Sequence, residues 1–291
     1  MTPKAILSRL EVVIGVRGTP RRLGAVIEEQ LRDHFGLSPV SAAERAEAVE
    51  KSVAMLIEKK RQEADRAGTL AMLVLSHAST RSVMGSCWVE PSDHPDIAIA
   101  KAQRLHVDAL LQEIRALTFN EFEIFGAKVL KELGALSVQV TPHADDQGID
   151  FYGLLSLGSL GGLPTSFMHL AHDVELRFAG QAKHYPNAAI GPDIIRELVG
   201  AIALARYKVY SSNHDLFEDL QLRAFNPLLA MIFTTGKFSR GARLLTERVE
   251  IIACPGEQLA VFLADRGVGM RVNANRATCF DRDAFRCWLM P

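Results

Sequence analysis

The chain has 291 residues, of which 48% are hydrophobic and 23% are charged, and this ordinary globular composition excludes a mainly disordered protein. Its 33 basic and 34 acidic residues give a net charge of −1, which excludes a globally basic nucleic-acid-binding protein but not a local basic groove. The length predicts two domains, or one domain with a large extension.

The first third of the chain carries apolar residues at helical spacing. This spacing predicts helices over residues 21–35, 41–67 and 97–117, the second of them ending at Gly68. Residues 69–76 are apolar and fit either a buried strand or a helix. Residues 79–95 are rich in Ser, Gly and Pro and predict a loop.

Beyond residue 117 the pattern changes to a mixture of helices and strands. The predicted helices cover residues 119–133, 192–205, 239–247 and 256–264. The predicted strands cover residues 135–141, 151–157, 174–183, 228–233 and 249–253. This order predicts a mixed α/β sheet flanked by helices.

The four cysteines are scattered through the chain at positions 87, 254, 279 and 287. No pair has CxxC spacing, so neither a zinc site nor a disulfide framework is indicated. We expect buried free thiols in a reduced compartment. The most apolar stretch, residues 69–75, is far shorter than the roughly 20 residues that span a bilayer, so we expect a cytoplasmic protein.

A candidate site follows from three polar residues on two predicted strands. Asp150 sits where a turn opens into a strand, and Gln181 and Lys183 are two positions apart on another strand, so both point to the same face. We expect the carboxylate of Asp150 and the amide oxygen of Gln181 to face one another across adjacent strands. Such oxygen ligands suit Mg²⁺, and Lys183 beside the metal could orient or deprotonate an attacking water, or balance charge. These residues also have a purely structural interpretation. Asp150 could cap a turn, and Gln181 and Lys183 could be a solvent-facing pair on the strand.

A series of segments beyond residue 117 strengthens the functional interpretation. They are Phe122-Glu123, Leu133-Gly134, Asp146-x-Gly148-Ile149-Asp150, Gln181-Ala182-Lys183-His184-Tyr185, Ile194-x-Arg196-Glu197-Leu198-x-Gly200-Ala201, Phe233-Thr234-Thr235-Gly236-x-Phe238-Ser239-x-x-Ala242, and Leu259 with Leu263. In this order they resemble the catalytic domain of the Mrr family of restriction endonucleases, in the PD-(D/E)xK nuclease superfamily. The resemblance covers about residues 117–267 and implies a restriction-endonuclease-like α/β core.

The resemblance also implies a role for each matched polar residue. Asp150 corresponds to the metal-binding acid and Lys183 to the active-site lysine. Gln181 stands where the wider superfamily has Glu or Asp, a substitution typical of the Mrr branch. Glu123 is similar to a helix acid that completes many such sites, directly or through water, and its alternative is an ordinary exposed helix acid. Asp146 precedes the catalytic turn and shapes it.

The function that the resemblance implies is a Mg²⁺-dependent deoxyribonuclease, with Mn²⁺ as a substitute, that hydrolyses phosphodiester bonds of double-stranded DNA. It would be a type II or type IV restriction enzyme of antiviral defence, in the second case acting on modified DNA. Cutting both strands needs two sites, so a homodimer or larger homo-oligomer is expected. The alternatives are a repair or junction-resolving nuclease of the same superfamily and a catalytically inactive DNA-binding module.

The sequence departs from the family pattern at three places. Gln147 replaces a Gly that is common there, and residues 158–173 and 206–226 are insertions. Long insertions are often functional loops, and these two could contact substrate. The insertions carry histidines at positions 169, 172 and 214, which we expect to be surface or packing residues because none has a partner at fixed spacing.

The predicted domain division places a helical region at residues 1–115 before a nuclease domain at residues 116–291. The basic positions of the first region that we expect to be exposed include Arg17, Arg21, Arg22, Lys59, Lys60 and Arg61. We expect this region to select DNA through phosphate contacts or to mediate assembly. The alternative is a structural cap, because apolar helix faces must pack somewhere.

Overall fold

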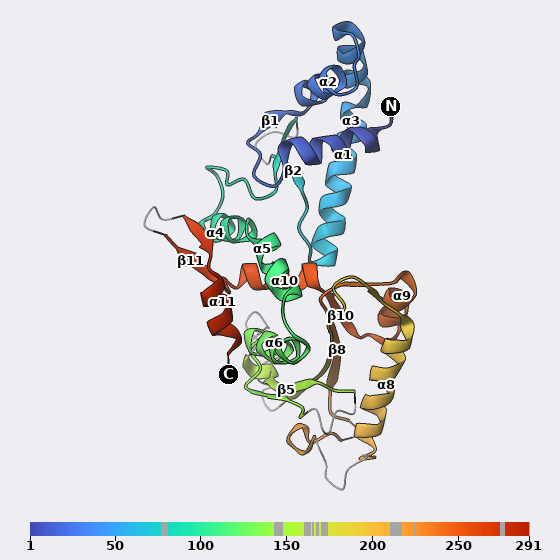
Figure 1. The fold of residues 1–291 in the computed structure, drawn as a ribbon, viewed down its shortest axis with the longest axis vertical. Coiled ribbons are helices and arrows are strands. Elements are labelled where there is room, and N and C mark those ends of the chain that lie inside the picture. The colour runs from blue at the N-terminus through green and yellow to red at the C-terminus, as the bar shows by residue number, and fades with distance from the viewer. Residues whose placement is uncertain are drawn as a thin grey trace. The chain divides into compact units, whose positions relative to one another are not determined.

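The computed structural model describes residues 1–76, 81–142, 148–159, 164, 166, 169, 174–209, 217–223, 225–273 and 277–290. Two compact units make up the chain (Figure 1). Unit 1 comprises Met1–Leu110 with Ala260–Asp281, and unit 2 comprises Leu111–Leu259 with Arg282–Pro291. Residues 260–281 therefore group with unit 1, and the boundary at residue 115 stays a prediction.

Unit 1 is built on three helices and a small antiparallel sheet. The helices are α1 (Pro3–Ile14), α2 (Leu23–Asp33) and α3 (Pro39–Ala67), and the strands, in spatial order, are β1 (Arg21–Arg22), β3 (Ser82–Gly85) and β2 (Leu73–Leu75). The predicted end of the long helix is confirmed, because Gly68 adopts the left-handed conformation at φ 62°. The first unit is thus mainly helical, as the sequence predicts.

Two predictions for unit 1 are wrong. The predicted loop contains β3, which pairs with both β1 and β2 and buries Val83 and Met84. The predicted helix over residues 97–117 is interrupted, giving α4 (Pro95–Arg104) and α5 (Val107–Arg115). Local composition predicts neither outcome, because the strand depends on pairing partners and the interruption lies inside a continuous apolar pattern. Unit 1 also contains the unpredicted hairpin of β11 (Met270–Val272) and β12 (Thr278–Phe280).

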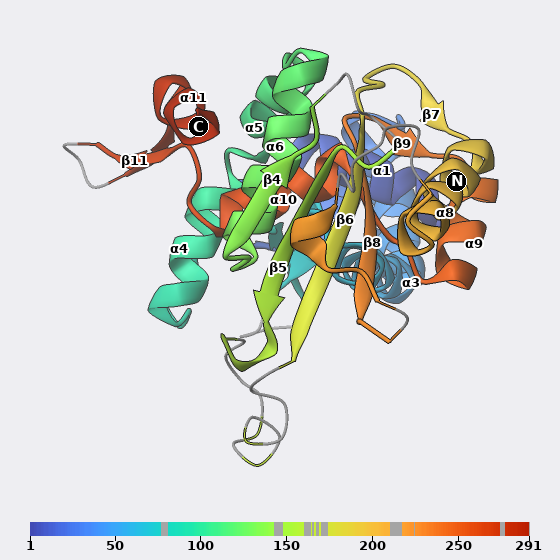
Figure 2. The ribbon, with the colours of Figure 1, turned by 90° about the horizontal axis from the view of Figure 1, so that it is seen from below.

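Unit 2 contains the mixed five-stranded sheet that the sequence predicts (Figure 2). In spatial order its strands are β10 (Ile252–Pro255), β8 (Leu228–Thr234), β6 (Glu175–Lys183), β5 (Phe151–Ser156) and β4 (Ser137–Val140). The β4, β5 and β6 strands run antiparallel, whereas β6, β8 and β10 run parallel. The expected α/β fold class, a restriction-endonuclease-like core, is confirmed.

Helices flank this sheet. They are α6 (Phe119–Glu132), α8 (Pro192–Arg206) and α9 (Arg240–Val249), and α11 (Arg282–Leu289) packs on α6. Helix α10 (Gly256–Asp265) begins in unit 2 and ends in unit 1. The short elements are β7 (Ala189–Ile190), β9 (Lys237–Phe238), η2 (Leu157–Ser159) and η3 (Glu218–Leu220). On the α6 side the buried ring of Phe151 fits against Gly126 and Gly180, neither of which leaves room for a Cβ. On the α8 side Ile195 packs in one core with Ala179 of β6. Successive residues of β6 therefore face different helices.

The last predicted strand is displaced along the sequence. The strand was expected at residues 249–253, but α9 continues to Val249 and β10 begins at Ile252. Glu250 takes the left-handed conformation between the two elements, which ends the helix. Helix α11 was not predicted. None of the described helices combines the length and the apolar composition that crossing a membrane requires.

The four cysteines are free, as their spacing predicts. Their burial differs, because Cys87 is buried whereas Cys287 is exposed on the solvent side of α11, opposite buried Phe285 and Leu289. The expectation of buried thiols is therefore wrong for Cys287. Burial raises the pKa of the Cys254 thiol to about 12, so this sulfur stays protonated and unreactive near neutral pH.

Candidate functional site

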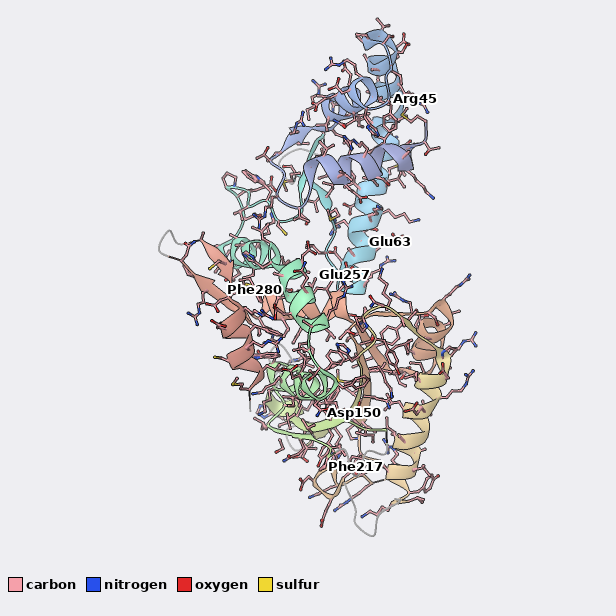
Figure 3. All side chains as sticks on the ribbon, in the orientation of Figure 1. Arg45, Glu63, Asp150, Phe217, Glu257 and Phe280 are labelled. Carbon is pink, nitrogen blue, oxygen red and sulfur yellow. The ribbon has the colours of Figure 1, made fainter. Side chains whose placement is uncertain are left out.

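The pairing of β5 with β6 places Asp150 beside the polar residues of β6. Phe151 pairs with Gly180, and the backbone N–H of Asp150 donates to the carbonyl of Gly180 at 2.9 Å. The Asp150 carboxylate is buried and its Oδ2 accepts from the Ala182 backbone N–H at 2.6 Å. Asp150 thus lies in the sheet between α6 and α8, at the end of β6 that carries Gln181 (Figure 3).

Gln181 is one of the most deeply buried polar residues of unit 2, with 1% of its surface exposed. Its Nε2 donates to Oε1 of Glu197 on α8 at 3.0 Å. Its amide oxygen is buried and, within the described part of the chain, makes no hydrogen bond. An unsatisfied buried acceptor costs about 1–3 kcal/mol, so this oxygen calls for an explanation.

Lys183 lies two residues further along β6, on the same face. Its side chain is only 17% exposed, and its Nζ lies 3.3 Å from the same Oε1 of Glu197 that accepts from Gln181. A solvent-facing Gln-x-Lys pair is therefore not what the structure contains. One carboxylate oxygen on α8 instead binds both polar side chains of the strand.

Glu197 is the site residue to which the sequence assigned no role. It belongs to one of the segments on which the family resemblance depends, and its side chain is half exposed. The signal that could have found it is its place on the helix, directly before buried Leu198 and two positions after buried Ile195. An acidic residue beside the apolar face of α8 can reach polar side chains of the strand on which that face packs.

Glu123 lies on α6, on the side of the sheet opposite α8. A capping box of Thr118 and Glu121 fixes the start of this helix, with a 2.7 Å hydrogen bond from the Thr118 backbone N–H to the Glu121 carboxylate. Only 7% of Glu123 is exposed, so the alternative of an ordinary exposed helix acid is wrong. Among the described residues, no group of three or more His, Cys, Asp or Glu side chains could hold a metal ion. The structure therefore does not gather Glu123 and Asp150 into a three-acid cluster.

The turn that leads to Asp150 needs a glycine. Gly148 has a φ of 85°, and a Cβ there would lie 3.1 Å from the Ala201 Cβ and 3.7 Å from the Gln181 Nε2. The turn thus lies directly against α8 and the Gln181 amide. Asp146, which has a predicted role, and Gln147, which departs from the family pattern, lie outside the described residues, as do His172 and His214 of the insertions.

The oxygen atoms of the site fit a small divalent cation. The Asp150 carboxylate and the Gln181 amide oxygen are hard ligands of the kind that Mg²⁺ prefers, and the Glu197 carboxylate adds negative charge beside them. The unbonded Gln181 Oε1 is the strongest indication, because a cation would give this buried atom the partner that it lacks.

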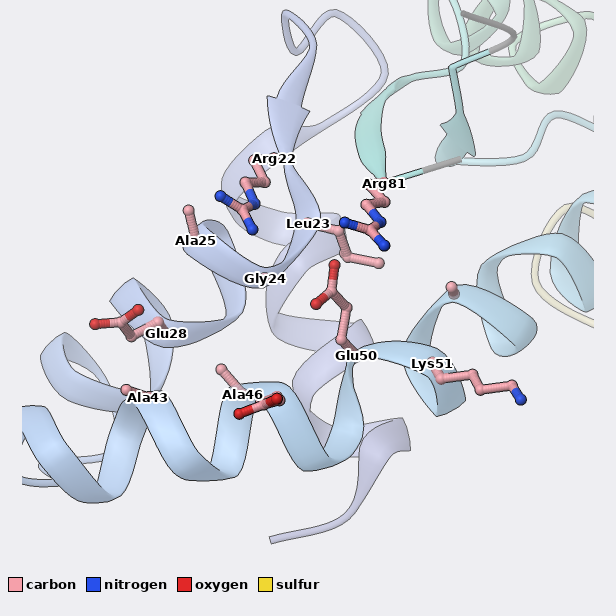
Figure 4. Close-up of a pocket in the computed structure, with 12 residues that line it drawn as sticks. Arg22, Leu23, Gly24, Ala25, Glu28, Ala43, Ala46, Glu50, Lys51 and Arg81 are labelled. Atoms are coloured by element: carbon pink, nitrogen blue, oxygen red, sulfur yellow. The ribbon is translucent and has the colours of Figure 1, made fainter. Parts of the chain in front are cut away.

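A hollow of about 720 Å³ lies in unit 1 between α2 and α3 (Figure 4). Its charged lining carries both signs, with Arg22 and Arg81 facing Glu50. The Glu50 carboxylate lies against the first turn of α2 at Gly24, whose N-terminal end attracts negative charge. We assign no chemistry to this hollow, since its charges already balance one another.

Residues 114–219 match the family model of the Mrr catalytic domain, which is described as a restriction endonuclease. This match confirms the predicted resemblance over residues 117–219, which include the predicted site residues, and the segments expected at residues 220–267 lie outside it. Among solved structures, the MspJI restriction endonuclease in complex with a 27-mer oligonucleotide is similar, with 18% sequence identity and a TM-score of 0.37. The similarity covers 62% of this chain and 36% of that one, so this chain matches little more than a third of that protein's length. No curated protein sequence matches the chain.

Proposed function

We propose that this protein is a metal-dependent DNA endonuclease that hydrolyses phosphodiester bonds. The observation that carries the proposal is the buried, unbonded amide oxygen of Gln181 beside the Asp150 carboxylate, within a segment that matches a restriction endonuclease family. A bound cation would give this buried oxygen a partner.

Asp150 and Gln181 would hold Mg²⁺, or Mn²⁺ in its place, through a carboxylate and an amide oxygen. A bound cation supplies Lewis-acid polarisation of the phosphate and neutralises its charge. Lys183 Nζ would donate to a phosphate oxygen and stabilise the charge that develops during water attack. Glu197 is a positioning residue, because its Oε1 accepts from both Gln181 and Lys183 and so fixes where the amide oxygen and the ammonium group lie.

Glu123 would complete the metal site through a water molecule. Its burial on α6 supports a role that requires enclosure. The proposal gives it an outer position, because the described residues contain no cluster of three acids.

We further propose that the protein assembles as a homodimer or larger homo-oligomer on double-stranded DNA, because one such site cuts one strand. By its family match it would be a restriction enzyme of antiviral defence, and cleavage that depends on base methylation would identify it as the branch that acts on modified DNA.

The test is nicking of a supercoiled plasmid by the full chain with Mg²⁺, with Mn²⁺ and with EDTA. Methylated and unmethylated preparations of one plasmid are compared in parallel. We expect cleavage with either cation, none with EDTA, and none from an Asp150→Asn variant purified in the same way. Duplex binding without cleavage under every metal condition would contradict the proposal and favour the inactive DNA-binding module.

A further inference from the structure

The segment from β9 through α9 presents a row of cationic side chains to solvent. The row consists of Lys237, Arg240, Arg243 and Arg248, all exposed, with Arg196 of α8 as an exposed neighbour. Within the described part of the chain, none of the five makes an ion pair. The acids nearest in sequence are Glu247 and Glu250 beside the row, and Asp193 and Glu197 beside Arg196, so the five cations outnumber these four acids. We call the first four residues the α9 row.

The α9 row begins at the end of the sheet that carries the candidate site. Strands β6 and β8 run parallel with Lys183 opposite Thr234, so both strands end together. After Thr234 the chain turns at Gly236, which packs so closely on the Tyr185 carbonyl that a Cβ would overlap it. Lys237 follows immediately in β9, which places the first cation of the row beside the segment that leaves Lys183.

The remaining cations follow along the helix. Ser239 caps α9 by accepting from the Ala242 backbone N–H at 3.2 Å, and a Cβ at Gly241 would lie 3.6 Å from Pro192 in the first turn of α8. The two helices thus begin side by side (Figure 1). Since a helix rises about 1.5 Å per residue, Arg240 to Arg248 spans about 12 Å, the axial length of three to four base-pair steps of about 3.4 Å.

The basic residues that the sequence singled out in unit 1 differ from the α9 row. Four of those six positions make ion pairs. The pairs are Arg21 with Glu29, Lys59 with Glu63, Lys60 with Glu11, and Arg61 with both Glu58 and Asp65. A cation that is already neutralised attracts a phosphate less than an unpaired one. Charge complementarity therefore favours unit 2 as the place where a polyanion binds.

We propose that the α9 row holds the phosphate backbone of duplex DNA next to the active site. This inference rests on the proposed nuclease function and adds the surface through which the substrate binds. Contacts to phosphates carry no sequence information, so the row positions any duplex for cleavage and leaves target choice to other parts of the protein. Binding through the row must weaken as salt rises, because each neutralised phosphate releases counterions.

The experiment measures binding of the full chain to a fluorescent duplex in EDTA, between 50 and 200 mM KCl. The double variant Arg240→Gln with Arg243→Gln is compared with Lys131→Gln, a control that removes an exposed cation of α6 with no ion pair among the described residues. Two lost phosphate contacts should lower the slope of log Kd against log salt by about 1.8. The control should bind like the wild type, and two duplexes of unrelated sequence should show the same loss.

The inference is overturned if the double variant keeps the wild-type slope and Kd, or if Lys131→Gln loses as much. Lys237→Gln with Arg248→Gln provides a second, independent pair on the same row and should behave like the first. Because binding is measured without metal, its outcome is separate from that of the nicking assay. If the wild-type protein cleaves DNA but both double variants bind it as the wild type does, only the proposed role of the α9 row is refuted. If the variants lose the salt dependence of binding but the wild-type protein never cleaves, only the proposed nuclease function is refuted.

Discussion

Oε1 of Glu197 accepts a hydrogen bond from Nε2 of Gln181 at 3.0 Å, and this bond fixes the orientation of the Gln181 amide group. The amide nitrogen is engaged by α8, and the buried amide oxygen has no hydrogen-bond partner among the described residues. This bond orients the neutral amide so that, under the proposed function, its oxygen can serve as a metal ligand. A second carboxylate, that of Glu197 on α8, lies beside this amide.

Replacing Asp150 with asparagine should abolish cleavage and leave the fold intact. Asparagine keeps an oxygen that can accept from the Ala182 backbone N–H, so the structural hydrogen bond survives while the charge is lost. Metal polarisation is worth several kcal/mol, so we expect a loss of roughly 1000-fold or more in single-turnover nicking. Calorimetric titration with Mn²⁺ should show metal binding lost as well. Nicking near the wild-type rate, with an unchanged melting temperature, would exclude Asp150 as a metal ligand.

Lys183→Ala should separate catalysis from metal binding. Its ammonium group contacts Glu197 and is not a metal ligand, so Mn²⁺ binding should stay within a few-fold of the wild type. Cleavage should fall by roughly 100-fold or more, since a donor aimed at developing charge contributes about 3–4 kcal/mol in comparable sites. If Lys183→Ala loses metal binding together with cleavage, the lysine acts by holding the site together and not on the phosphate.

Gln181→Leu tests the unbonded oxygen directly. Leucine fills a similar volume and removes the unsatisfied acceptor, so the free energy of unfolding should stay the same or rise. Metal affinity and cleavage should both fall by about 10- to 100-fold, the usual cost of disturbing an oriented ligand shell. A tolerated leucine, with wild-type metal affinity, would mean that Gln181 is only a residue of the strand.

The sequence was sufficient to predict that two residues of the candidate site share one face of a strand. The side-chain period of two puts Gln181 and Lys183 on one face, and the structure has both pointing to α8. Glu197 lies sixteen residues from Gln181 on a helix. Its contact depends on how α8 packs on the sheet, which no local pattern of the sequence specifies. Glu197 was therefore part of a recognised motif, but its role could not be inferred from the sequence.

The ends of a helix were predictable from the sequence where a residue at the end itself determines them. They were not predictable where a residue distant in sequence is involved. Gly68 and Ser239 mark helix ends through their own conformation or side chain, and both were predicted at these positions. The helix that was expected over residues 97–117 is interrupted next to His106, whose ring contacts the carbonyl of Thr278 at 3.0 Å. A partner so far away in sequence leaves no local signal.

Two glycines of unit 2 should respond in opposite directions to alanine. Gly180 lies against the buried ring of Phe151, where a Cβ would overlap, so Gly180→Ala should lower the free energy of unfolding by about 1–3 kcal/mol. Gly200 lies inside α8 with nothing near its Cβ position, so Gly200→Ala should raise the free energy of unfolding by up to about 1 kcal/mol. Urea unfolding of the full chain measures both. Equal effects of the two substitutions would contradict the packing of Phe151 between α6 and the sheet.

Exchanging the two side chains of the Gln181–Glu197 pair tests whether they act as a unit. Gln181→Glu alone places two carboxylates against one another, so it should keep only part of the cleavage activity although a carboxylate is the stronger metal ligand. Glu197→Gln alone keeps an acceptor oxygen for Gln181 but removes the charge that binds Lys183, and should cost about 10- to 100-fold in cleavage.

The double variant restores one carboxylate and one amide with their positions exchanged. It should cleave better than either single variant and bind Mn²⁺ at least as tightly as the wild type, with a coupling energy of about 0.5–3 kcal/mol. A residue that only stabilised the fold would change the melting temperature and not the metal affinity, so both are measured on all four proteins. Additive losses in cleavage, with no recovery of metal binding in the double variant, would show that Glu197 does not act through Gln181.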